Sequence, residues 1–204
     1  MNVLVTAADS ALGAMLCQHL AKGHDVAPVG RRAAANIDGY QCVDLVEAER
    51  VANILQGVDA VVHALPNAAR LADVDSEGEL LDWVSRATYV LATTACAAGV
   101  RRIVLLSSLD LMRSYDERFI VTAQWQPRPL ANAESLAPHM AELVGREVAR
   151  TGKIEVVALR LGNMDVEVAA GEVAEAVESA LSEPLSASYH WQVQHVASSG
   201  RFAH

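Results

Sequence analysis

The sequence predicts an α/β fold built on a doubly wound parallel sheet. Short apolar, β-branched runs without strict alternation are typical of strands covered on both faces. These runs alternate along the chain with helical patterns of ten or more residues, as crossover connections between parallel strands require. The composition agrees: 52% of the 204 residues are hydrophobic but only 4% are aromatic. At this length we expect a single domain over residues 1–204.

The first predicted unit is a strand, a small-residue turn and a helix. Asn2 to Thr6 is apolar and β-branched, and Ala11 to Leu20 carries apolar residues at helical spacing before the stop at Gly23. A helix that begins directly after such a turn points its unpaired N–H groups and its dipole at the space above the turn. This unit therefore predicts an anion site, although only Gly13 in the turn is glycine.

The later elements follow the same alternation. Val58 to Leu65 is continuously apolar and stops at Pro66, while the helix Leu80 to Gly99 ends at a glycine C-cap. Pro138 suits the first turn of a helix. The other expected strands are His24 to Gly30, Tyr40 to Asp44, Arg102 to Leu106, Ile154 to Leu161 and a late edge strand, Ser188 to Val196. The other expected helices are Val46 to Leu55, Pro138 to Arg150 and Gly171 to Leu181.

Two regions depart from this regular pattern. Residues 109–132 hold several prolines and show no periodicity, and a stretch of this kind in a compact domain is usually functional or mobile. The C-terminal part, residues 162–204, is short and leaves little room for a separate substrate region.

Composition excludes several classes of function. A net charge of −9 argues against a nucleic-acid partner. No apolar run reaches the roughly 20 residues that span a bilayer, and Met1 leads directly into the first strand, so we expect a soluble, cytoplasmic protein. Cys17, Cys42 and Cys96 are scattered in apolar surroundings, which predicts buried free thiols and no metal site.

Four segments, in order, carry a resemblance to a known family. They are VTAADSALG, VDLVEAERVANILQGVDAVVHAL, AAGVRRIVLLSS and LAPHMAELVGREVARTGKIEVVALRLGN. Together they cover nearly the whole chain and resemble the extended short-chain dehydrogenase/reductases, the NAD-dependent epimerase/dehydratase family. The resemblance implies a Rossmann-like fold that binds a nicotinamide dinucleotide above the first turn. It says nothing certain about activity.

The resemblance places Ala7, Ser10 and Gly13 at the three glycine positions of the cofactor loop. A Cβ at either of the first two crowds the pyrophosphate, which predicts weak or lost binding; the alternative is a turn that has lost its ligand. Arg31 and Arg32 stand where an acidic residue would select NAD, so NADP is favoured, unless they are a solvated basic pair. The cofactor residues so implied are Thr6, Ala7, Asp9, Ser10, Ala11, Leu12, Gly13, Arg31, Arg32, Asp44, Leu45, Ala64, Leu65, Pro66 and Ser107. His63, inside an apolar strand, is interpreted as a core histidine.

Catalysis in this family resembles carbonyl chemistry assisted by a YxxxK pair on one helix face. That pair is absent, since the only lysines are Lys22 and Lys153 and neither follows a tyrosine at this spacing. The family's tyrosine and lysine positions fall on Glu134 and Pro138. Ser108 falls on the serine/threonine position, where it serves the substrate or caps a turn. Tyr115 and Glu134 are the candidates for a substitute acid.

Three functions remain open. The first is a non-catalytic or sensing NADP(H)-binding module. The second is an active NADP-dependent oxidoreductase, epimerase or dehydratase that acts on a small carbonyl or sugar with atypical acid/base residues. The third is a purely structural subunit. Relatives often pair through two long helices, which here are Leu80 to Gly99 and Pro138 to Arg150, so we expect a homodimer.

Overall fold

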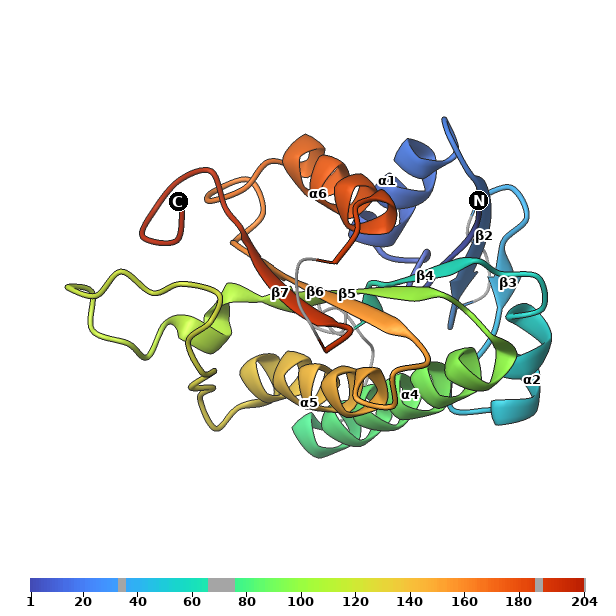
Figure 1. The fold of residues 1–204 in the computed structure, drawn as a ribbon, viewed down its shortest axis with the longest axis horizontal. Coiled ribbons are helices and arrows are strands. Elements are labelled where there is room, and N and C mark those ends of the chain that lie inside the picture. Colours follow the sequence, from blue (N-terminus) through green and yellow to red (C-terminus); the bar gives the residue numbers. More distant parts are fainter. Residues whose placement is uncertain (33–35, 66–75, 186–188, 204) are drawn as a thin grey trace.

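A computed structural model of the chain describes residues 1–32, 36–65, 76–185 and 189–203. Its seven strands form one parallel sheet in the order β3-β2-β1-β4-β5-β6-β7 (Figure 1), as a doubly wound fold requires. The strands are β1 (Asn2–Val5), β2 (Asp25–Gly30), β3 (Gln41–Cys42), β4 (Ala60–His63), β5 (Arg102–Ser108), β6 (Glu155–Leu161) and β7 (Trp191–Val196). The sheet confirms the predicted fold class.

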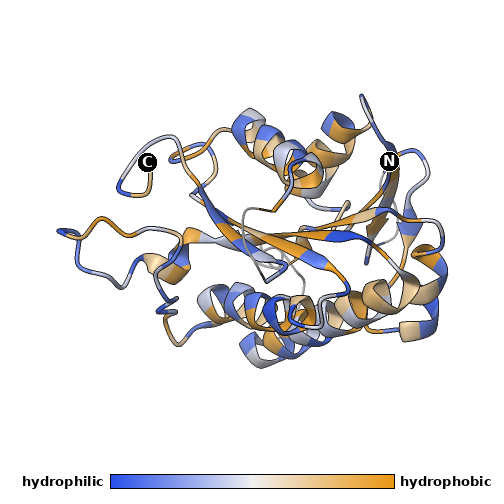
Figure 2. Ribbon diagram, viewed as in Figure 1, coloured by the Kyte–Doolittle hydropathy of each residue, from blue (hydrophilic) through white to orange (hydrophobic). Residues whose placement is uncertain are grey.

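Helices cover both faces of the sheet. Helices α1 and α6 lie on one face, and α2, α4 and α5 lie on the other, with α4 and α5 side by side (Figure 1). The helices are α1 (Ala11–Leu20), α2 (Ala48–Ile54), α4 (Glu77–Ala98), α5 (Ala133–Ala149) and α6 (Ala170–Ser182). The strands are the apolar layer between them (Figure 2). Within that layer Val3, Leu4 and Val5 of β1 are fully buried, which explains their lack of alternation.

Helix α5 begins earlier than the sequence predicts. Asn132 caps it, because its side chain accepts a hydrogen bond from the N–H of Ser135 at 3.0 Å. Pro138 therefore lies inside the helix and not in its first turn. Its missing N–H leaves the carbonyl of Glu134 without the usual i+4 donor. The prediction was wrong because an Asn cap competes with a proline as a start signal.

The other element ends follow the predicted signals closely. Gly99 closes α4 with a left-handed φ of 79°, which confirms the predicted C-cap. At the opposite end, α4 begins three residues before the predicted start, where Ser76 accepts from the N–H of Glu79 at 3.2 Å. β7 pairs in parallel with β6 at the sheet edge, as predicted, although Ser188 lies outside the described residues.

Residues 109–132 have a small apolar core of their own. A short 3-10 helix, η2 (Leu109–Met112), opens the segment, and Tyr115 and Val121 pack with it against Phe202 from the C-terminal end. The segment is irregular in backbone but held by burial.

The three cysteines differ in burial. Cys42 is exposed and Cys96 is half-buried, so of the three only Cys17 is buried as predicted.

None of the described helices has the length and apolar character that crossing a membrane requires.

Candidate functional site

The turn after β1 adopts the shape of a glycine-rich loop with fewer glycines. Ala7 has a φ of 52°, in the left-handed region that glycine usually fills. Gly13 allows α1 to approach this turn closely, since a Cβ there would lie 2.1 Å from the carbonyl oxygen of Ala7. The close helix-to-strand approach, which needs the last small residue of the motif, is therefore retained.

Ser10 organises the start of α1 without blocking it. Its hydroxyl donates to the carbonyl of Ala7 at 2.7 Å and accepts from the N–H of Gly13 at 3.0 Å. The N–H groups of Ala11 and Leu12 have no hydrogen-bond acceptor among the described residues. The side chains of Ala7 and Ser10 are both only 8% exposed. Two helix N–H groups thus remain free to bind an anion above the turn.

Thr6 joins β1 to the end of β4 beneath this turn. Its hydroxyl accepts from the N–H of Ala64 at 3.1 Å and lies 3.0 Å from Nδ1 of His63. The other ring nitrogen of His63 lies 3.0 Å from the hydroxyl of Thr88. Burial lowers the pKa of His63 to about 3, so the ring is neutral. These contacts confirm the interpretation of His63 as a core residue, and Leu65 beside it is also buried.

Asp9 and Arg32 form an ion pair at the end of β2. The Asp9 carboxylate accepts from the backbone N–H and from Nε of Arg32, each at 3.1 Å, and Arg32 also donates to the Asp9 carbonyl at 2.9 Å. Gly30 leaves room for the Asp9 carboxylate, because a Cβ at position 30 would lie 2.4 Å from Asp9 Oδ1. The negative charge of Asp9 is therefore paired with an arginine.

Arg31 lies in a separate cluster with Trp83 and Asp44. Its guanidinium stacks on the Trp83 ring at 4.7 Å from the centroid, and its Nε is 3.8 Å from Asp44. The Trp83 indole donates to the same carboxylate at 3.2 Å. Leu45 next to Asp44 is buried. Trp83 comes from α4, far along the chain, and the sequence interpretation missed it. Pro66, the remaining predicted cofactor residue, lies outside the described residues.

At the end of β5, both serine side chains serve the protein itself. Ser107 donates to Glu142 of α5 at 2.6 Å. Ser108 caps η2, because its hydroxyl accepts from the N–H of Asp110 at 3.1 Å. The capping alternative for Ser108 is thus observed. Among the described residues, no group of three His, Cys, Asp or Glu side chains could hold a metal ion.

The substitute acids proposed from sequence, Tyr115 and Glu134, lie in different surroundings. Tyr115 is 8% exposed, donates to the carbonyl of Gln126 at 2.7 Å and packs edge-to-face on Trp125. Glu134 is exposed in the first turn of α5, so it is not a buried carboxyl. Tyr115 thus contacts two residues of the 109–132 segment, Gln126 and Trp125.

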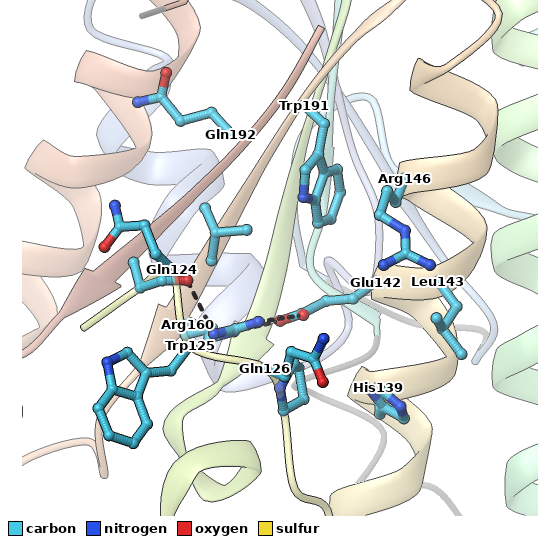
Figure 3. Close-up of a pocket in the computed structure, with 13 residues that line it drawn as sticks. Gln124, Trp125, Gln126, His139, Glu142, Leu143, Arg146, Arg160, Trp191 and Gln192 are labelled. Atoms are coloured by element: carbon cyan, nitrogen blue, oxygen red, sulfur yellow. Dashed lines mark hydrogen bonds and ion pairs between the residues drawn. The ribbon is translucent and has the colours of Figure 1, made fainter. Parts of the chain in front are cut away.

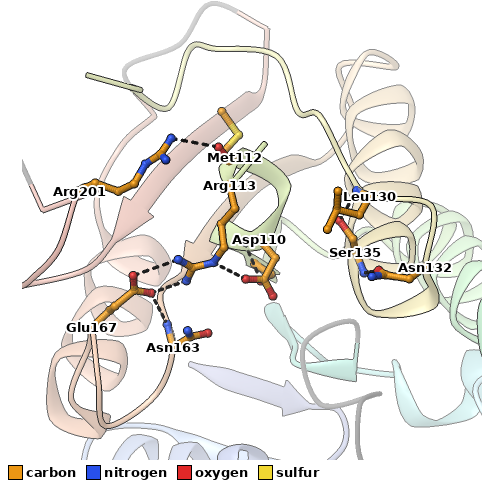
Figure 4. Close-up of polar contacts among 10 residues, drawn as sticks. Asp110, Met112, Arg113, Leu130, Asn132, Ser135, Asn163, Glu167 and Arg201 are labelled. Carbon is orange, nitrogen blue, oxygen red and sulfur yellow. Dashed lines mark hydrogen bonds and ion pairs between the residues drawn. The ribbon is translucent and has the colours of Figure 1, made fainter. Parts of the chain in front are cut away.

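A polar cluster fixes the chain just beyond β5 and β6 (Figure 4). Arg113 donates to Asp110 at 2.6 Å and to both carboxylate oxygens of Glu167, at 3.2 and 2.5 Å. Glu167 also accepts from the N–H of Asn163 at 2.9 Å. The Arg113 guanidinium holds the pKa of Glu167 below its ordinary value. This cluster ties η2 to the segment after β6.

Comparison with solved structures identifies close matches to the fold. Uronate dehydrogenase from Agrobacterium tumefaciens has a TM-score of 0.80 at 21% identity, with 96% of this chain and 76% of that chain covered. The same enzyme is also known as a mutant in complex with NAD. UDP-N-acetylglucosamine 4-epimerase from Bacillus cereus has a TM-score of 0.75 at 18% identity, covering 97% and 79%. dTDP-glucose 4,6-dehydratase from Streptomyces venezuelae, solved with NAD, has a TM-score of 0.79 at 19% identity, with 96% of this chain and 75% of that chain covered.

At these identities the solved structures establish a common fold and no more. No curated protein matches the sequence. The model of one family, described as the NAD dependent epimerase/dehydratase family, matches residues 3–180. That match spans the turn after β1 and the whole of α5. The chain therefore belongs to the NAD dependent epimerase/dehydratase family, whose fold binds a nicotinamide dinucleotide.

Proposed function

We propose that this protein binds NADP(H) at the turn after β1 and serves as a non-catalytic or sensing module. The observation that carries the proposal is the surface of α5. Where the family resemblance implies tyrosine and lysine, α5 has the exposed Glu134 and the buried Pro138. Proline offers neither a proton nor a charge, so the family's route for moving a proton is missing.

Cofactor binding is supported by the geometry of the turn. The N–H groups of Ala11 and Leu12 suit a pyrophosphate, and the helix dipole favours its negative charge. Ala7 already has the backbone conformation that the first glycine would supply. The side chains of Ala7 and Ser10 turn into the protein, which reduces the crowding expected from their Cβ atoms. A bound dinucleotide would supply a hydride or a redox-dependent charge.

The preference for NADP rests on Arg31 and Arg32. Both side chains are about half exposed, at 45% and 53%, at the end of β2, where the adenosine ribose is expected. Each is held by one acidic residue and keeps other N–H groups for a 2′-phosphate. The Asp9 carboxylate is engaged by Arg32, which limits its repulsion of the phosphates.

A titration with NADPH and NADH tests this proposal. We expect NADPH to bind at least about tenfold more tightly than NADH, and the double variant Arg31→Ala/Arg32→Ala to remove this preference. Arg118→Ala is the matched control, because that side chain is 85% exposed and pairs only with Asp116 among the described residues. Equal affinities for the two cofactors would contradict the assignment of NADP. Failure of both to bind at millimolar concentration would contradict cofactor binding itself.

The alternative is an active NADP-dependent oxidoreductase, epimerase or dehydratase with atypical acid/base residues. The retained hydroxyl of Ser108 at the end of β5 favours it. A screen of sugar nucleotides and simple carbonyls, with Ser108→Ala as the comparison, separates the two functions. Turnover that falls in Ser108→Ala would establish the active enzyme and overturn the non-catalytic role.

We also propose a homodimer formed by α4 and α5. These helices lie together on one sheet face and carry three large exposed apolar side chains: Tyr89, Met140 and Leu143. The exposed fractions are 59%, 36% and 40%, respectively. An apolar surface of this kind suits a self-complementary pairing of two copies.

A further inference from the structure

A second concave site lies beside α5, toward the β7 edge of the sheet. It is a groove of about 570 Å³ between α5, β6, β7 and the segment 123–127 (Figure 3). This volume falls within the roughly 300 to 1,000 Å³ that small-molecule sites occupy. None of the described residues assigned to the cofactor lines it.

The floor of the groove is a buried ion pair. Nε and one terminal nitrogen of Arg160 donate to the two oxygens of Glu142, each at 2.8 Å, and Ser107 donates to the same carboxylate. Arg160 is 2% exposed and Glu142 is 4% exposed. The pair gives the groove a rigid, polar base with no net charge.

Two tryptophans present fixed flat surfaces in the groove. Trp191 packs directly on the backbone of α5 at Gly145, where a Cβ would lie 3.3 Å from its ring. Trp125 packs edge-to-face on Tyr115, with ring centroids 4.9 Å apart. The two rings lie on different sides of the ion pair (Figure 3). They are held in place before any ligand arrives, which lowers the entropic cost of binding.

Two polar side chains of α5 remain for a ligand. Arg146 is about half exposed. Its guanidinium pairs with the neighbouring Glu147 at 3.3 Å. Nδ1 of His139 is buried without a hydrogen-bond partner. Burial lowers the pKa of His139, so the imidazole is neutral at neutral pH. Among the residues that line the groove, Arg146 and Arg160 carry positive charge and Glu142 carries negative charge.

We propose that this groove binds a small aromatic carboxylate. The ring of the ligand packs on the indole of Trp191, which lies against Gly145, the neighbour of Arg146. Its carboxylate pairs with the guanidinium of Arg146, whose planar N–H groups match it. His139 lies about two helical turns from Arg146 and lines another part of the groove. The residues that line this site are not those proposed for the dinucleotide, although Ser107, one of the latter, donates to Glu142 in the floor.

The test uses benzoate, 1-naphthoate and indole-3-acetate as probes of the full chain by isothermal titration calorimetry. We expect saturable binding of at least one probe, which Arg146→Gln weakens about tenfold or more. Arg150→Gln is the matched control, because Arg150 lies one turn further on and pairs with the same Glu147 at 3.0 Å outside the groove. The carboxamide of the best probe should bind as weakly to the wild type as the probe binds to Arg146→Gln.

Three outcomes would overturn the proposal. The first is no saturable binding of any probe at millimolar concentration. The second is equal weakening by Arg146→Gln and Arg150→Gln, which would indicate a general charge effect. The third is displacement of the probe by NADPH, which would place the probe at the turn after β1. Circular dichroism of both variants shows that the fold is kept, as expected for exposed positions.

Discussion

At the scale of single residues, Gly13 is the position where the turn tolerates no side chain. A Cβ there would lie 2.1 Å from the carbonyl oxygen of Ala7, which is backbone and has little freedom to move. We expect Gly13→Ala to lower the free energy of unfolding by about 2 kcal/mol or more, measured by urea unfolding. Gly23→Ala is the control, because nothing lies within 4 Å of a Cβ at that position. Similar stability of the two variants would contradict the close approach of α1.

His63 makes a second prediction at this scale. Its pKa is lowered to about 3 by burial, against an ordinary value of 6.5. Above pH 6.5 the ring is neutral in the folded and the unfolded state, so it adds no pH dependence to the free energy of unfolding. Below pH 6.5, only the unfolded chain binds a proton at this ring. Stability is therefore lost as the pH falls from 6.5 toward 3. Between pH 7 and pH 5 this residue should cost about 2 kcal/mol.

The variant His63→Gln isolates this contribution. It retains hydrogen-bonding groups beside Thr6 and Thr88 but has no titrating ring. Whatever its absolute stability, its loss between pH 7 and pH 5 should be about 2 kcal/mol smaller than that of the wild type. If the wild type and His63→Gln lose the same free energy of unfolding between pH 7 and pH 5, measured by urea unfolding, His63 is protonated in the folded protein.

At the scale of elements, the pair Glu142–Arg160 joins α5 to β6. Both residues are buried, so removal of one partner leaves an uncompensated charge. We expect Glu142→Gln to lower the free energy of unfolding by about 3 kcal/mol. Glu147→Gln, a half-exposed position on the same helix, should change it by less than about 0.5 kcal/mol. The apolar double variant Glu142→Leu/Arg160→Met should recover much of the loss, and its failure to do so would indicate that packing is responsible.

Sequence patterns predicted the elements better than they predicted the contacts between them. The inner strands β1, β4, β5 and β6 are marked by apolar runs, because burial on both faces of the sheet disfavours polar side chains. Arg160 within such a run was the available signal for a buried partner, but its partner, Glu142, lies on another element. Trp83 meets Arg31 and Asp44 in the same way. Periodicity reports which face of an element is buried and not which residue faces it.

At the scale of the whole molecule, the order of the elements and the family could be predicted, and the state of the candidate site could not. The family motifs lie at turns and strand ends, so they mark the candidate site along the chain. Whether Ser108 serves a substrate or a cap depends on where η2 places the N–H of Asp110. The packing of Phe202 on the 109–132 segment likewise follows from the folded chain alone. Contacts between distant segments have no signature in one sequence.

The assembly is also decided at this scale. If α4 and α5 pair across a dimer, light scattering should give a mass of about twice 21.7 kDa. The double variant Tyr89→Glu/Met140→Glu should then give the mass of one chain, because it places like charges opposite one another in an apolar contact. Val166→Glu is the control, since that side chain is 74% exposed outside these helices and should leave the dimer intact. A wild-type mass of 21.7 kDa at every concentration would exclude this pairing and leave the exposed apolar side chains of α4 and α5 to another partner.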